Sequence, residues 1–233
     1  MPDTYPSMTA LYKDPLNVEG TTYARRWLRH EWRQVAEAQA THMSETRSIV
    51  LAIHGGGIEP GTSEIALAAA GFHPATLAPA EDGLGTHDFW LFEGLLQTDN
   101  HRLHVTASNY DEPIATKLVG NALRCISLHG CTDDHANGKI QLGGRDEGLR
   151  DLILEELLAA GIDAEIATGP MLAGRQKENI ANKTAGCGGA QLELGRSYRK
   201  SLFDADTTAQ RKNTTNDKFR LLVRALRTAM SRV

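Results

Sequence analysis

Cysteine is scarce in this sequence, which has only Cys125, Cys131 and Cys187 among 233 residues. A small, odd number of cysteines argues against a secreted domain built on paired disulfides. Long apolar runs are also missing, and no stretch approaches the roughly 20 residues that cross a bilayer. Because the first residues do not resemble a signal peptide, we expect a cytoplasmic protein without a membrane partner. Release by cell lysis stays an open alternative.

Neither sign of charge dominates, since 25 Lys and Arg face 29 Asp and Glu for a net charge of −4. This balance gives no general attraction to nucleic acid, and we do not expect a nucleic-acid partner. The hydrophobic content of 41% is ordinary for a globular protein, and 233 residues can bury one sizeable core. We therefore expect a single catalytic domain over residues 1–233, with its core at about 47–205, and a monomer.

Short apolar runs alternate with helical patterns along the chain. The expected strands are 48–53, 88–95, 103–108, 124–130, 139–143, 163–168 and 188–194. The expected helices are 65–70 with Thr62 or Ser63 as cap, one that Pro113 opens and that continues through Leu118, 148–160 and 216–230. Interleaved strands and helices predict an α/β fold with a mixed, mainly parallel central sheet and helices on both faces.

The N-terminal region offers one further helical pattern, over residues 23–40, after a turn-rich segment 1–20 that we expect to be irregular. Trp27 and Trp32 fall on one face of this pattern, and arginines fall largely elsewhere. Basic residues beside tryptophans are compatible with a nucleic-acid or membrane surface. A core-facing stripe with a solvated basic side is the favoured interpretation.

A glycine-rich loop, residues 54–64, follows the expected strand 48–53 and contains His54, Glu59 and Glu64. Its glycine spacing resembles a phosphate-binding loop, but Thr62 stands where that loop needs a lysine. A plain strand-to-helix turn is the second interpretation. The third is a metal loop with His54 and Glu59 as two ligands, which suits zinc. The loop alone does not decide between them.

A second strand also ends in His-Gly, at His129-Gly130. If both strands are parallel neighbours, His54 and His129 emerge at the same edge of the sheet. Together with Glu59 they would form a two-histidine, one-carboxylate zinc site with an open fourth position.

Hydrolysis at such a site needs a base, and Glu193 in the expected strand 188–194 is the best candidate. A carboxylate between apolar neighbours in a sheet is costly unless it faces a site or a partner. The alternative is an ion pair of Glu193 with Arg196 or a solvated position.

An anionic substrate needs cationic anchors, and arginine binds carboxylates through two parallel hydrogen bonds. Arg145 follows two glycines and is the most site-like arginine, with Arg196 next. Asn179 and Asn182 are candidates for hydrogen bonds to a substrate carboxylate or carbonyl. We therefore predict these four residues as substrate-binding, with Arg145 also neutralising charge in catalysis.

Eight motifs in this order resemble the phage-type poly-gamma-glutamate hydrolase family. They are His54–Glu64, Phe92–Leu95, Leu103–Thr106, Asp111–Pro113, Ser127–Cys131, Gly143–Arg145, Asn179–Asn182 and Gln191–Leu194. The resemblance covers roughly residues 47–205. It implies a zinc carboxypeptidase-like fold and one zinc held by His54, Glu59 and His129. It also implies Glu193 as catalytic base and cleavage of the γ-glutamyl amide of poly-γ-glutamate.

Two alternatives remain, because specificity depends on the loops around a site rather than on the fold. One is a zinc amidase or peptidase that acts on another amide, such as a cell-wall peptide. The other is a non-catalytic binding protein associated with replication of a phage or mobile element, a label that this family has also carried.

Overall fold

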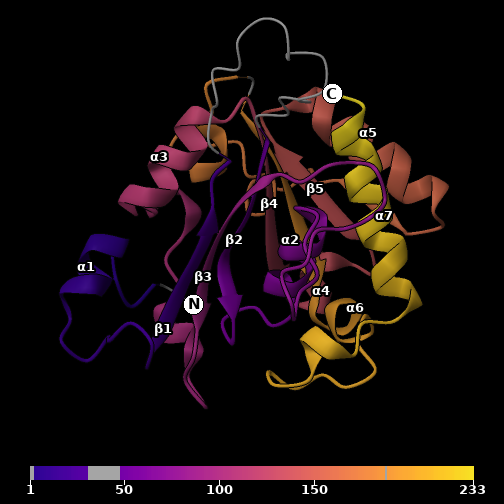
Figure 1. The fold of residues 1–233 in the computed structure, drawn as a ribbon. Helices are drawn as coiled ribbons and strands as arrows, with labels where there is room; N and C mark the ends of the chain where they lie inside the picture. The colour runs from indigo at the N-terminus through magenta and orange to yellow at the C-terminus, as the bar shows by residue number, and fades with distance from the viewer. Residues whose placement is uncertain (1–2, 31–47, 187) are drawn as a thin grey trace, which may run out of the picture.

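A seven-stranded sheet forms the centre of the protein in a computed structural model, which describes residues 3–30, 48–186 and 188–233 (Figure 1). The strands lie in the order β1-β3-β2-β4-β7-β5-β6. Their bounds are β1 Tyr23–Leu28, β2 Ser48–Gly56, β3 Asp88–Gly94, β4 Arg124–Cys131, β5 Ile140–Gly144, β6 Ala164–Ile166 and β7 Gly189–Gly195.

The sheet is mixed and mainly parallel, as predicted. Strands β3, β2, β4 and β7 run in the same direction, and β6 is parallel to β5. Strand β1 pairs antiparallel with β3, and β5 pairs antiparallel with β7. The four central strands therefore end at one common edge, which is where ligands bind in open α/β sheets.

Helices cover both faces of the sheet, so that the protein has three layers (Figure 1). The α-helices are α1 Met8–Lys13, α2 Thr62–Ala69, α3 Pro113–Asn121, α4 Asp133–Ala136, α5 Glu147–Ala159, α6 Arg196–Lys200 and α7 Asp217–Ser231. Short 3₁₀ turns are η2 Asn100–Leu103, η3 Ala107–Asn109, η4 Ile180–Asn182 and η5 Arg211–Asn213. No helix among the described residues combines the length and apolarity needed to cross a membrane.

The side chains of β2 alternate between two hydrophobic cores, one on each face of the sheet. Ile49 and Leu51 pack into the core that contains residues of α1 and α3. Val50 and Ala52 pack into the opposite core, with residues of α2, α5 and α7. Successive side chains of a strand point to opposite faces, so a continuous apolar run is what a strand between two helical layers requires.

The prediction of a helix over residues 23–40 is wrong for those of its residues that the structure describes. Residues 23–28 form the edge strand β1, and residues 31–40 lie outside the described part of the chain. Arg26 forms an ion pair with Glu93 of the neighbouring β3, and Trp27 stacks on Trp90. Cross-strand pairs of this kind stabilise a sheet, and their partners lie far away in sequence.

Two further predictions from the sequence need correction. Helix α1 interrupts the segment 1–20, which was expected to be irregular, and its N-cap is Ser7. Residues 103–108 do not form a strand but lie in and between η2 and η3. The Asp3 carboxylate accepts hydrogen bonds from His104 and from the backbone N–H of Thr106, which gives this segment the partners that a neighbouring strand would supply.

Candidate metal centre

Strands β2 and β4 bring the two His-Gly sequences to the same edge of the sheet. They are parallel neighbours, with Leu51 opposite Ser127 in the register. A bulge between Ala52 and Gly55 lies at His54, just before the glycine loop. The topological condition for a shared site of His54 and His129 is therefore met.

Three predicted ligands lie together at this edge. Nδ1 of His54 lies 3.2 Å from Nδ1 of His129 and 3.1 Å from Oε1 of Glu59. Oε2 of Glu59 lies 4.0 Å from Nδ1 of His129 and accepts a hydrogen bond from the N–H of Gly130 at 2.8 Å. Both imidazoles are buried, with only 3% of each residue exposed.

Hydrogen bonds orient the two imidazoles. Nε2 of His54 lies 2.9 Å from the carbonyl oxygen of Val105. Because a carbonyl only accepts, Nε2 carries a proton, so a neutral His54 would present the lone pair of Nδ1 to the cluster. Nε2 of His129 lies 2.9 Å from Oγ of Ser127, which leaves its Nδ1 directed at His54. Such outer partners are typical of metal-binding histidines.

The cluster fits a zinc ion on the chemistry of its donors. Two imidazole nitrogens and a carboxylate converge as electron-pair donors, and three such groups repel one another unless a cation or a proton lies between them. Two nitrogens and one oxygen also match the ligand types of catalytic zinc sites. The separations of 3.1–4.0 Å allow one small ion to contact all three residues.

Burial and the carboxylate set the ionisation of these groups. Burial lowers the pKa of His54, but the Glu59 carboxylate beside it raises that pKa above its ordinary value. Burial would raise the pKa of Glu59, yet His54 lowers it to about 2. Burial lowers the pKa of His129 to about 3, which keeps this imidazole neutral. A neutral histidine and an ionised glutamate are the forms that bind metals, so Glu59 and His129 already have the required form, whereas His54 would give up the proton that Glu59 stabilises.

His104 is a neighbour that the sequence reasoning missed, although it lies in one of the motifs of the resemblance. Its ring stacks on His54 at 3.9 Å between centroids, and its Nε2 lies 4.0 Å from Oε1 of Glu59. Nδ1 is bound by the Asp3 carboxylate at 2.7 Å, so Nε2 faces the cluster with a lone pair. His54, Glu59 and His104 therefore offer three ligand atoms that all lie within 4.8 Å of one another, as one metal ion requires.

Glu193 projects from β7, directly beside His129 of β4 in the register. It is buried, and burial together with the nearby Glu59 raises the pKa of its carboxyl to about 8. Its Oε1 accepts a hydrogen bond of 2.9 Å from Nε2 of Gln191. The alternative ion pair with Arg196 is not found among the described residues.

Asn179 holds Gln191 in the orientation in which Gln191 contacts Glu193. Its Nδ2 donates to Oε1 of Gln191 at 2.8 Å, and Gln191 in turn donates to Glu193. Its Oδ1 accepts from the N–H of Ala181, and only 3% of Asn179 is exposed. These contacts favour a role in positioning Glu193 over the predicted contact with substrate.

Arg145 and Asn182 do not join the cluster. Arg145 follows β5, which is antiparallel to β7, and its N–H bonds to the carbonyl of Gly189 at the start of β7. Asn182 accepts from the same N–H and from that of Gly189. Gly189 and Glu193 are four residues apart in a strand, about 13 Å. Both residues therefore lie toward the edge of the sheet opposite the histidines.

Arg196 lies beside the cluster instead, on α6, which begins where β7 ends. The buried Arg199 of the same helix donates from Nη1 to the carbonyl of Pro60 at 2.6 Å and from Nε to that of Leu194 at 3.1 Å. It thus joins the glycine loop to the strand of Glu193. Sequence patterns gave no signal for this role, because both partners are backbone groups.

The glycine loop is held by hydroxyl groups that the sequence suggested as helix caps. That prediction is wrong, because the residue before α2 is Gly61, which makes no side-chain cap. Oγ1 of Thr62 donates to the carbonyl of Glu59, and Oγ of Ser63 accepts from the N–H of Gly56. These bonds fix the loop around Glu59 as a strand-to-helix turn, and this turn is compatible with a metal-binding role of Glu59.

The sequence matches the model of one protein family over residues 28–225, that of poly-gamma-glutamate hydrolases. The chain belongs to this family. The resemblance carried by the eight motifs is therefore confirmed.

Three relatives come from Bacillus subtilis (strain 168). YndL is 37% identical over 172 residues, which are 73% of this chain and 62% of YndL. The SPbeta prophage-derived protein YoqZ is 35% identical over 75% of this chain and 58% of YoqZ. YmaC is 31% identical over 78% of this chain and 71% of YmaC. The matched part of this chain thus spans less than two thirds of YndL and of YoqZ.

Two solved structures share the fold. A bacteriophage poly-gamma-glutamate hydrolase superposes with a TM-score of 0.80 at 30% identity, over 98% of this chain and 96% of that structure. A zinc-free form of YndL superposes with a TM-score of 0.77 at 30% identity, over 98% and 97% of the two chains. The predicted fold class is therefore confirmed at the level of the whole architecture.

Proposed function

We propose that this chain is a zinc-dependent hydrolase that cleaves the γ-glutamyl amide bonds of poly-γ-glutamate. The observation that carries the proposal is the meeting of His54, Glu59 and His129 at one sheet edge, with the buried Glu193 on the adjacent strand. Membership in a hydrolase family and the likeness to a phage poly-gamma-glutamate hydrolase support the reaction and the substrate. The zinc-free state of a similar structure supports the choice of metal.

His54, Glu59 and His129 would hold one zinc ion, and Nε2 of His104 lies 4.0 Å from Oε1 of Glu59. When bound, zinc supplies a Lewis acid that polarises the scissile carbonyl and makes water more acidic. The contacts of His54 Nε2 with the carbonyl of Val105 and of His129 Nε2 with Oγ of Ser127 leave each Nδ1 as the nitrogen that would bind the ion.

Glu193 acts as the general base and then as the general acid. It takes a proton from the attacking water and returns that proton to the nitrogen of the leaving amine. Gln191 donates a hydrogen bond to Oε1 of Glu193, so Oε2 is the oxygen that we assign to proton transfer. Asn179 fixes the amide of Gln191 and thereby the direction of the carboxylate.

Cationic groups near the cluster neutralise negative charge on the substrate. Arg196 retains the role expected of it, because α6 places it beside the glycine loop. We do not extend that role to Arg145 and Asn182, whose contacts are with the start of β7.

The proposal is tested by product analysis on three substrates with wild type and Glu193→Gln. We expect γ-linked glutamate oligomers from poly-γ-glutamate, and no products from α-linked polyglutamate or from cell-wall peptides. Glu193→Gln should lower turnover by about 100-fold or more, as expected for loss of a general base. Cleavage of a cell-wall amide instead would keep the centre and replace the substrate. Turnover that survives in Glu193→Gln would contradict the assignment of the base.

The described residues do not favour the replication-associated alternative. It depended on the basic C-terminal helix and on a basic, tryptophan-bearing helix at residues 23–40. In the C-terminal helix α7, Arg220 pairs with Asp217 and Arg227 pairs with Asp82. Residues 23–28 form the strand β1 instead of a helix. Within that strand Arg25 pairs with Glu19 and Glu112, and Arg26 pairs with Glu93. These arginines are therefore neutralised by carboxylates of the protein itself.

A further inference from the structure

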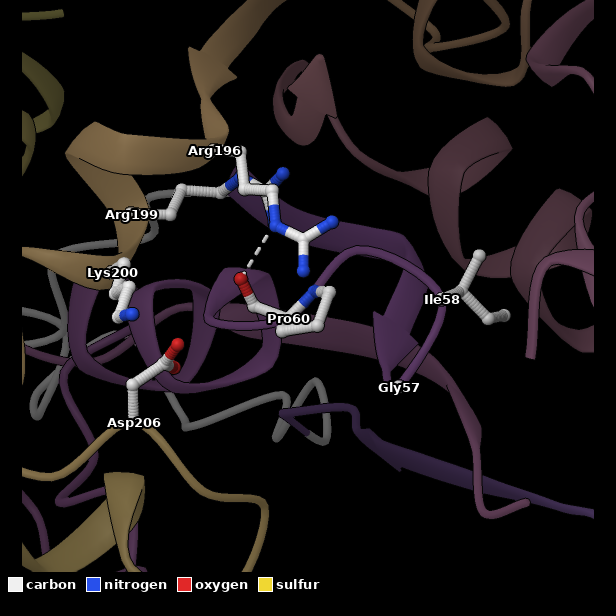
Figure 2. A pocket seen from close by; sticks show the side chains of 7 residues that line it. All are labelled: Gly57, Ile58, Pro60, Arg196, Arg199, Lys200 and Asp206. Atoms are coloured by element: carbon white, nitrogen blue, oxygen red, sulfur yellow. Dashed lines mark hydrogen bonds between the residues drawn. The ribbon is translucent and has the colours of Figure 1, made fainter. Parts of the chain in front are cut away.

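A pocket of about 200 Å³ lies between the glycine loop and α6 (Figure 2). Gly57, Ile58 and Pro60 of the loop form one side of it. The remaining lining residues follow β7 in the chain and are Arg196, Arg199, Lys200 and Asp206. Because Ile58 and Pro60 flank Glu59, the pocket opens beside a proposed metal ligand. It therefore lies where a group close to the scissile bond would be.

The basic residues of the pocket are available to a ligand. Arg196 and Lys200 are exposed, and neither side chain forms a hydrogen bond or an ion pair within the described part of the chain. Asp206 is the pocket's acidic residue, and it already pairs with the buried Arg211 at 3.2 Å. The lining is thus positive in sum, which favours an anion.

Arg199 gives the pocket a fixed cationic wall. Its guanidinium is buried and held by two carbonyls, with Nε bound to Leu194 and Nη1 bound to Pro60. Nη2 has no hydrogen-bond partner among the described residues. A guanidinium that is fixed in this way loses little freedom when it binds an anion, so the unused nitrogen is a preorganised donor.

We propose that this pocket binds the α-carboxylate of the γ-linked glutamyl residue next to the scissile amide, through Arg196, Arg199 and Lys200. The inference rests on the proposed function and adds the group of the substrate that is recognised. In a γ-linked chain the α-carboxylate is attached to the carbon that bears the amide nitrogen. In an α-linked chain the carboxylate lies at the end of a flexible side chain, two carbons farther away. A cationic pocket beside the metal loop therefore distinguishes the two linkages.

The pocket is tested by equilibrium binding that does not depend on turnover. Zinc-loaded Glu193→Gln protein is titrated with a short γ-linked glutamate oligomer by calorimetry, alone and combined with Arg196→Gln or Lys200→Gln. Each added change should weaken binding by about tenfold, as for the loss of one charge-assisted hydrogen bond. Lys117→Gln makes the same change of charge on exposed α3, at the opposite end of the molecule (Figure 1), and should leave the affinity unchanged.

A second measurement separates failure of the pocket from failure of the proposed function. With Glu193 intact, Arg196→Gln and Lys200→Gln should raise KM for poly-γ-glutamate at nearly constant kcat. The two changes should lose this effect on a polymer whose α-carboxylates are amidated. Equal affinities and equal KM values for the variants and wild type would overturn the pocket while leaving the hydrolase in place. A wild type that binds the oligomer through Arg196 and Lys200 but cleaves no γ-linked polymer would overturn the function and keep the pocket.

Discussion

Nδ1 of His54 lies 3.2 Å from Nδ1 of His129, although 75 residues separate them in the chain. Parallel pairing of β2 and β4 produces this closeness, and the Glu59 carboxylate completes the set. His129→Ala should therefore weaken zinc binding by at least about 100-fold, since an imidazole ligand is lost. The measurement is competition with a chelator, and Ser127→Ala should cost about tenfold through the loss of an outer partner.

His104 offers a sharp contrast to His129. Its ring stacks on His54, and its Nε2 lies 4.0 Å from Oε1 of Glu59, whereas Nδ1 of His129 lies 3.2 Å from Nδ1 of His54. We expect His104→Ala to weaken zinc binding less than about tenfold, in the range of an outer-shell change. The same competition assay decides the matter. A larger loss in His104→Ala than in His129→Ala would make His104 the third ligand.

Gln191 should matter for turnover but not for substrate binding. Its Nε2 holds Oε1 of Glu193, while its own Oε1 is held by Asn179. Gln191→Met keeps the shape of the side chain and removes this donor, so we expect kcat to fall by about tenfold with KM nearly unchanged. Steady-state kinetics on zinc-loaded protein measure both. A rise in KM at constant kcat would assign Gln191 to substrate binding instead.

Gly130 is needed because Arg199 passes close to it. A Cβ on Gly130 would collide with the guanidinium of Arg199, which cannot move away without losing its bonds to Pro60 and Leu194. Gly130→Ala should lower the free energy of unfolding by about 1–3 kcal/mol, the usual cost of overpacking. Gly169→Ala, where a Cβ meets open space, serves as the control in chemical denaturation. Equal stabilities of the two variants would contradict the packing.

His87 should make the fold sensitive to acid. It is 1% exposed, and burial lowers the pKa of its imidazole from 6.5 to about 4. The unfolded chain therefore binds a proton near pH 6.5 that the folded chain takes up only near pH 4. Stability is consequently lost as pH falls through this window, by about 2 kcal/mol between pH 7 and pH 5 from this group alone.

Chemical denaturation at both pH values checks the role of His87. His87→Phe removes the titrating group, and its loss of stability between pH 7 and pH 5 should be smaller than that of wild type by about 2 kcal/mol. Its unfolding free energy at pH 7 should stay close to that of wild type, because Nδ1 of His87 has no hydrogen-bond partner to lose. Identical pH dependence of the two proteins would refute the assignment.

The sequence predicted the parts of the fold whose signals are local. Apolar runs that stop at glycine marked β2, β4 and β7, and the residues at their ends, His54, His129 and Glu193, converge at one edge. Pro113 marked the start of α3, where the carboxylate of the preceding Glu112 accepts from the N–H of Ala115. These strand ends and this helix start could be predicted because the residues that define them are neighbours in sequence.

The parts that the sequence could not predict depend on distant partners. Tryptophans with helical spacing suggested a helix at residues 23–28, where the structure has β1 paired with β3. The partners that stabilise this strand, Glu93 and Trp90, lie more than 60 residues away and give no local signal. Asp3 holds His104 across 101 residues, and Arg199 binds a carbonyl 139 residues away. A double glycine before Arg145 looked like a site, but the antiparallel direction of β5 carries it to the opposite edge.

The central claim is that one metal ion at His54, Glu59 and His129 works with Glu193 to hydrolyse poly-γ-glutamate. The most direct measurement is stepwise addition of zinc to metal-free protein, with bound metal and release of γ-glutamyl products followed together in wild type and Glu193→Gln. We predict that both proteins bind one zinc per chain, and that turnover rises in proportion to bound zinc in wild type alone. Full turnover without stoichiometric metal, or equal turnover in both proteins, would contradict the account.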